Sequence, residues 1–180
     1  MKPLPAQIII NTGEFHFSSE RVSIHTLLGS CVAFTAWHPV RRIGGMCHYL
    51  LPTGESDRSS CNRQSGLYAE GAVSLFEQAF RAARTRASDY VVKMFGGGSM
   101  FPQHSLGRSC DMPCDPKLSP SACRDIPCRN VTQGRSIFTA HGFVISGADV
   151  GGIGSRQLIF DVWSGDVWIR RNKAVALLPG

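Results

Sequence analysis

Short apolar segments separated by turn-forming residues make up the first fifty positions of the chain. The segments QIII, EFHF, VSIHTLL, CVAFTAW and IGGMCHYLL are divided by residues such as Asn11, Gly13 and Pro39. Short apolar runs that end at turn residues are typical of β-strands. The pattern therefore predicts a series of strands up to Pro52, followed by a polar loop with the sequence TGESDRSSCNRQSG.

Helical spacing replaces this pattern from about Leu67 to Arg86. One stripe of apolar residues recurs there every three or four positions: Tyr68, Ala72, Leu75, Phe76, Ala79 and Ala83. Such a stripe predicts an amphipathic helix that packs on a sheet. A second helix is predicted from Asn130 to His141, where Gly142 ends it.

The remaining apolar segments are strand-like. DYVVKMF predicts a strand that ends in the glycine-rich turn GGGSM, and FVISGADV, RQLIFDVW and DVWIRR predict three more strands. The last two are expected to form a hairpin across Ser164 and Gly165. Strands thus come first, without the repeated βαβα alternation of a doubly wound fold, so we predict a mixed α+β layered domain.

The length of 180 residues suits one domain. Residues at about 102–125 are rich in Pro, Ser and Cys and follow neither period. We therefore predict a single domain over residues 1–180 with an irregular Cys/Pro-rich insertion at about 102–125.

Charge and hydropathy exclude several classes of protein. The net charge is +6, but the Lys and Arg residues are scattered and form no basic stripe, which disfavours nucleic-acid binding. No apolar run reaches the roughly 20 residues of a membrane span, and the N-terminal segment does not resemble a signal peptide. We expect a cytoplasmic protein, and acidic protein partners fit the positive excess.

Seven cysteines cannot all pair internally, because the number is odd. Cys110, Cys114, Cys123 and Cys128 follow the spacing Cys-x3-Cys-x8-Cys-x4-Cys, which differs from the Cys-x2-Cys pairs typical of zinc sites. A zinc site, reduced thiols and a disulfide all stay open for these four residues. We expect no metal or cofactor at the catalytic site.

Cys31 follows a Gly29-Ser30 pair at the head of an apolar run, where it is either a buried hydrophobe or a nucleophile held at a turn. His48 lies on the next predicted strand, and a hairpin can bring the start of one strand beside the end of the other. A nearby imidazole would take the thiol proton and produce a thiolate at neutral pH. Cys47 is expected to face the opposite side of the sheet.

Several motifs occur in the order found in the chemoreceptor glutamine deamidases, the CheD family: TLLGSCVAF, IGGMCHYLLP, LYAEGAVSLFEQAF, VKMFGGGSMF, CRNV and GADVGGIGSRQLIFDVWSGDV. The chain resembles this family over nearly its whole length outside the insertion. The resemblance implies a layered α/β/β/α sandwich of mixed sheets, similar to the catalytic domain of the cytotoxic necrotizing factor toxins. It also implies a cysteine hydrolase without a cofactor.

The same resemblance assigns Cys31 as nucleophile and His48 as base. The third residue of the family site is a threonine six positions before the cysteine, where this chain has His25, whereas Thr26 stands five positions before it. Neighbouring strand residues face opposite sides, so the displacement matters. We expect Thr26 to complete the site, with His25 as the alternative.

The function implied by the resemblance is deamidation of glutamine side chains in methyl-accepting chemotaxis receptors during adaptation. Glutamate and ammonia would form through a thioester on Cys31. Two alternatives stay open at this point. The protein can be a regulatory docking partner of a CheC-type response-regulator phosphatase, or a cysteine-dependent transglutaminase or peptidase with the same residue pair.

Overall fold

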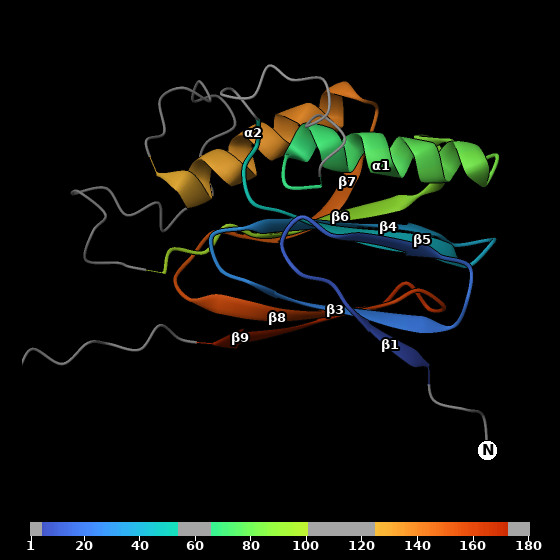
Figure 1. The fold of residues 1–180 in the computed structure, drawn as a ribbon, viewed down its shortest axis with the longest axis horizontal. Helices are drawn as coiled ribbons and strands as arrows, with labels where there is room; N and C mark the ends of the chain where they lie inside the picture. The colour runs from blue at the N-terminus through green and yellow to red at the C-terminus, as the bar shows by residue number, and fades with distance from the viewer. Residues whose placement is uncertain (1–4, 54–65, 101–124, 173–180) are drawn as a thin grey trace, which may run out of the picture.

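Two β-sheets lie face to face in the computed structural model of the chain, which describes residues 5–53, 66–100 and 125–172 (Figure 1). The strands are β1 (Ala6–Ile9), β2 (Phe15–Ser18), β3 (Val22–Leu28), β4 (Val32–His38), β5 (Ile43–Tyr49), β6 (Val91–Gly96), β7 (Ile145–Val150), β8 (Ser155–Asp161) and β9 (Val167–Asn172). One sheet has the order β2-β5-β4-β6-β7 and the other β1-β3-β8-β9.

Both sheets mix strand directions. The β1–β3 and β6–β7 pairs are parallel, whereas the other neighbours are antiparallel. Together with two α-helices, the sheets confirm the predicted α+β layered class with mixed sheets. The β8–β9 hairpin is confirmed as well, and Gly165 in its turn has a φ of 78° that favours glycine.

Both α-helices pack on the outer face of the five-stranded sheet (Figure 1). Helix α1 spans Ala69–Ala82, inside the predicted range, and helix α2 spans Ile126–Ala140. Helix α2 begins four residues before the predicted start, because Pro127 lies in its first turn, where a missing N–H costs no hydrogen bond. A short 3-10 helix, Ala87–Asp89, precedes β6.

The layers of the described residues therefore run α/β/β. The expected α/β/β/α order has a second helical layer, which the described ranges do not contain. The physical reason is that α1 and α2 share one aromatic cluster: Phe76 and Phe80 of α1 and Phe138 of α2 are buried together, and the Phe138 ring stacks 3.6 Å from that of Phe34 in β4. A common cluster places both helices on the same sheet.

A second core fills the space between the two sheets. Ile24, Ala33, Met46 and Phe160 belong to it, whereas Cys47 belongs to the core under the helices. The alternation of strand side chains thus directs Cys47 away from the face of Met46, as predicted.

No helix in the described ranges is long and apolar enough to cross a membrane. The predicted insertion at about 102–125 lies outside the described residues, except for Asp125 at the start of α2.

Candidate active site

Cys31 lies at the end of a tight turn, directly before β4. The glycine-rich turn after β6 is hydrogen-bonded to this segment. The Gly97 N–H donates to the Cys31 carbonyl at 2.7 Å, and the Gly98 N–H donates to the Gly29 carbonyl at 2.8 Å. A Cβ atom on Gly96 would lie 2.2 Å from the Cys31 carbonyl oxygen, so only glycine permits this approach. The GGGSM turn therefore positions the Cys31 backbone.

His48 faces the same side of the sheet as Cys31. In the antiparallel β4–β5 pair, His48 lies opposite Ala33, and Cys31 precedes Ala33 by two positions. Residues two apart on a strand share a face, and the Cys31 side chain packs against the same core as Ala33. The hairpin thus places Cys31 and His48 on the same face of the sheet, at neighbouring strand ends.

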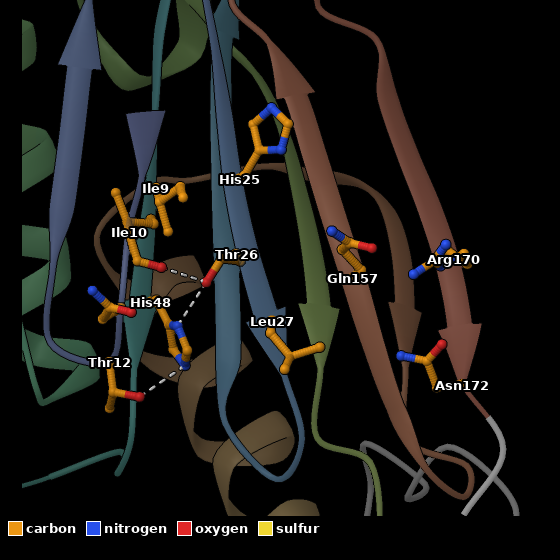
Figure 2. A pocket seen from close by; sticks show the side chains of 11 residues that line it. Ile9, Ile10, Thr12, His25, Thr26, Leu27, His48, Gln157, Arg170 and Asn172 are labelled. Atoms are coloured by element: carbon orange, nitrogen blue, oxygen red, sulfur yellow. Dashed lines mark hydrogen bonds between the residues drawn. The ribbon is translucent and has the colours of Figure 1, made fainter. Parts of the chain in front are cut away.

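Thr26 holds the imidazole of His48 in one orientation (Figure 2). The Thr26 hydroxyl lies 2.9 Å from Nδ1 of His48 and donates its own proton to the Ile10 carbonyl at 2.8 Å. Because that proton is used, Nδ1 must be the donor to Thr26. Nε2 of His48 is then unprotonated, as a general base requires.

His25 lies on the other side of β3. Its ring nitrogen Nε2 contacts the Ser23 hydroxyl at 3.0 Å, and Figure 2 shows its side chain pointing away from His48. The register of β3 with β8 runs without a bulge from Ser23 to Leu28, so Thr26 faces inward between the buried Ile24 and Leu28. Of the two candidates, the structure brings Thr26 to the imidazole.

Thr12 is a neighbour that sequence reasoning missed. Its hydroxyl lies 3.3 Å from Nε2 of His48, and its side chain also hydrogen bonds with the thiol of Cys31. One hydroxyl therefore lies beside both the sulfur and the unprotonated imidazole nitrogen, and donates its single proton to one of them at a time. No local pattern reveals this contact, because Thr12 is 36 positions from His48 and approaches only where the chain leaves β1.

Burial controls the charge of the thiol and the imidazole. It raises the pKa of the Cys31 thiol above its ordinary value, although hydrogen bonds from the Thr12 and Ser30 side chains oppose the rise. It also lowers the pKa of His48 from 6.5 to about 4, against the attraction of Glu14. At neutral pH the pair is thus a neutral thiol beside a neutral imidazole, not the resting thiolate expected from the sequence.

Asn130 of α2 is a second residue whose place at the site the sequence did not reveal. Its Nδ2 donates to the carbonyls of Ser30 and Leu50, each at 2.9 Å, and the side chain is fully buried. Ser30 directly precedes Cys31, and Leu50 follows His48 by two positions. Asn130 therefore ties the ends of the two strands that carry the thiol and the imidazole.

No group of three His, Cys, Asp or Glu side chains in the described part of the chain is arranged to hold a metal ion. Cys110, Cys114 and Cys123 lie outside the described residues. Cys128 lies in α2 and is disulfide-bonded, and a disulfide sulfur is not the thiolate that binds zinc.

His48, Thr26 and Thr12 line an open pocket of about 580 Å³ (Figure 2). The pocket continues from the imidazole over the outer face of the four-stranded sheet. It is lined further by Ile9, Ile10, Asn11, His25, Leu27, Gln157, Arg170 and Asn172.

Comparison with known proteins adds a family to this geometry. Residues 50–171 match the family model described as CheD chemotactic sensory transduction. The chain is 42% identical over 163 residues to the probable chemoreceptor glutamine deamidase CheD 3 of Dechloromonas aromatica, covering 91% of this chain and 86% of the relative. It is 37% identical over 172 residues to the probable chemoreceptor glutamine deamidase CheD of Pseudomonas savastanoi pv. phaseolicola, and this match covers 96% of this chain and 88% of the relative.

Proposed function

The chain belongs to the CheD family, and from that premise we propose that it is a chemoreceptor glutamine deamidase. It converts glutamine side chains of methyl-accepting chemotaxis receptors to glutamate, with release of ammonia, in the cytoplasm. The observation that carries the proposal is the hydrogen-bonded arrangement of Thr26, His48 and Thr12 beside the Cys31 thiol. These groups have the roles that acyl transfer through a cysteine needs.

The reaction begins with attack of the Cys31 sulfur on the carboxamide carbon of the receptor glutamine. A bond forms between sulfur and carbon while the thiol proton moves to Nε2 of His48 and the carbonyl oxygen becomes an oxyanion. Because the resting thiol is neutral, proton transfer accompanies the attack. Thr26 stabilises the imidazolium that forms, since Nδ1 keeps its hydrogen bond throughout.

Collapse of the tetrahedral intermediate releases ammonia. Nε2 of His48 donates its proton to the amide nitrogen, the carbon–nitrogen bond breaks, and a thioester remains on Cys31. Nε2 then takes a proton from water, and the hydroxide attacks the thioester. The carbon–sulfur bond breaks, glutamate leaves, and the Cys31 sulfur recovers its proton from His48.

The backbone N–H of Cys31 is the proposed donor to the oxyanion. This N–H belongs to the same residue as the sulfur, so it is the nearest backbone donor to the carbonyl that is attacked, and its polarity opposes the rise in the thiol pKa. A backbone donor beside the attacked carbonyl stabilises charge that develops in the transition state.

The proposal is tested by mass spectrometry of a cytoplasmic receptor fragment incubated with the protein. We expect a gain of about one mass unit at specific glutamines, with ammonia release, and neither product with Cys31→Ala. Cys47→Ala is the matched control, because Cys47 is the other free cysteine in the described ranges and faces away from the site. Full activity of Cys31→Ala contradicts the proposal, a lysine adduct indicates a transglutaminase, and chain cleavage indicates a peptidase.

Docking on a CheC-type phosphatase of the response regulator is a second proposed role. The net charge of +6 suits an acidic protein partner. Cys31→Ser separates the two roles: we expect it to lose deamidation but to keep any effect on the phosphatase. A parallel loss of both effects contradicts a separate docking role.

A further inference from the structure

Two rows of side chains cross the outer face of the four-stranded sheet, next to the candidate active site. Strand register aligns Ile9 of β1 with His25, then Ile159 and Trp168. A parallel row aligns Leu27 of β3 with Gln157 of β8 and Arg170 of β9. Neighbours in register point to the same side of a sheet, so each row is continuous.

Three large apolar side chains on this face are exposed to solvent. Ile9 is 71% exposed, Leu27 60% and Trp168 52%. A single exposed apolar residue is ordinary, but a group on adjacent strands indicates a binding surface. Both helices cover the other sheet, and so leave this face uncovered by helix in the described residues (Figure 1).

This face and the imidazole share one pocket. Leu27, Gln157 and Arg170 line it together with Thr12 and His48 (Figure 2). The continuity arises because β1 ends at Ile9 beside His25 of β3, and the residues that follow, from Ile10 to Thr12, line the pocket between the sheet face and the imidazole. A polypeptide that lies along this pocket therefore passes from the outer face to the imidazole of His48, the proposed base of the reaction.

The charge of the pocket favours an acidic occupant. Its lining contains the cation Arg170 but no Asp or Glu. Deamidation itself adds a carboxylate wherever a glutamine has reacted. From β3 to β9 the face spans two strand spacings, about 10 Å, which is the width of one helix with its side chains.

We propose that the outer face formed by Ile9, Leu27, Gln157, Trp168 and Arg170 docks the receptor segment that flanks the target glutamine. The occupant presents apolar side chains to Leu27 and Ile9 and glutamate carboxylates to Arg170. This inference rests on the proposed deamidase function and adds a binding surface to it. Leu27 and Arg170 are specificity residues outside the group that touches the reacting atoms.

Binding of a receptor fragment to protein that carries Cys31→Ala tests the surface, because the fragment then stays unreacted. Adding Leu27→Ser and Arg170→Gln should raise the Kd at least about tenfold. The matched controls are Val144→Ser and Arg81→Gln, which change an apolar residue of 71% exposure and an exposed arginine away from this face. We expect both controls to leave the Kd unchanged.

Salt dependence provides a second measurement. Added salt should weaken binding of the fragment, and Arg170→Gln alone should reduce that dependence because one ion pair is lost. Circular dichroism of each variant establishes that it is folded.

Equal Kd values for the doubly substituted protein and its parent overturn the docking surface, as does failure of the fragment to bind the Cys31→Ala protein. Dissociation of a dimer by Leu27→Ser would overturn it too, because the face would then be an interface between copies of the chain. The deamidase function is judged separately, by ammonia release from wild-type protein. Each proposal can therefore fail without the other.

Discussion

The hydroxyl of Thr26 accepts a hydrogen bond from Nδ1 of His48 at 2.9 Å while it donates to the Ile10 carbonyl at 2.8 Å. A hydroxyl has one proton to donate, so its partner nitrogen must carry a proton. The Ile10 carbonyl thereby selects the tautomer of His48 through Thr26. A neutral hydroxyl here orients an imidazole, as the carboxylate does in Ser-His-Asp hydrolases.

Removal of that hydroxyl should impair catalysis without removing a reacting group. In Thr26→Val the shape is kept, but the Nδ1–H of His48 is buried without an acceptor, which costs about 1–3 kcal/mol. We expect kcat for receptor deamidation to fall roughly tenfold to a hundredfold, and Thr26→Ser to restore most of it. Ammonia release in steady state is the measurement.

His25→Ala is the control for this experiment, since His25 faces the opposite side of β3. Because His25 also lines the proposed docking face, its removal is expected to change KM at most, and to leave kcat for receptor deamidation unchanged. If kcat falls further with His25→Ala than with Thr26→Val, the assignment of Thr26 as the third residue is wrong.

The low pKa of His48 should make the protein less stable in mild acid. The folded pKa is about 4 and the ordinary value is 6.5, so the unfolded chain binds the extra proton between these two pH values. Stability from this group is complete above about pH 6.5 and is lost as the pH falls toward 4. Between pH 7 and pH 5 the free energy of unfolding should fall by about 2 kcal/mol.

Urea denaturation of wild type and His48→Gln at the two pH values measures this effect. The glutamine at position 48 does not titrate. The advantage of wild type over His48→Gln in the free energy of unfolding should therefore shrink or reverse as the pH falls. If the two proteins differ in the free energy of unfolding by the same amount at pH 7 and at pH 5, the imidazole of His48 is not buried in its neutral form.

The raised pKa of Cys31 predicts slow alkylation at neutral pH. The thiolate is the species that reacts with iodoacetamide, so the rate should keep rising above pH 9. Thr12→Val removes a hydrogen bond that lowers the thiol pKa, and should shift the rate profile further toward alkaline pH.

The measurement is mass spectrometry of the peptide that contains Cys31, which separates it from the other cysteines. Cys47 is an internal control, because full burial raises its pKa to about 12 and shields it from reagent in the native protein. Rapid alkylation of Cys31 at pH 7 would indicate a preformed thiolate and contradict the neutral pair.

Substitution of Asn130 should disturb both strands that carry the site. Asn130→Ala leaves the carbonyls of Ser30 and Leu50 without their side-chain donor, at about 1–3 kcal/mol for each unsatisfied group. We expect a lower melting temperature and a fall in kcat that exceeds any rise in KM. Asn130→Asp should be at least as damaging, because a carboxylate repels the two carbonyl oxygens.

Thermal unfolding followed by steady-state kinetics below the transition distinguishes the two effects. Thr132→Ala is a matched control in the same helix, since its hydroxyl bonds only to carbonyls of α2 itself in the described structure. Normal kcat in folded Asn130→Ala would limit the role of Asn130 to stability.

Local patterns in the sequence determined much of the architecture. Apolar runs bounded by turn residues are properties of short segments, so they located the strands and α1. The short turn between the strands of Cys31 and His48 made their pairing predictable, because antiparallel neighbours separated by few residues have few alternative registers. The same alternation placed Cys47 on the opposite face.

Only the tertiary structure decided how the site is completed. Thr26 and His25 are adjacent in sequence, and the packing of one face of β3 against the second sheet selected Thr26. Thr12 lies 36 positions before His48 in the sequence, and Asn130 lies 100 positions after Ser30, yet both contact the site in the folded chain. The protonation state of the pair follows from burial, and burial is a property of the assembled sheets rather than of any local segment.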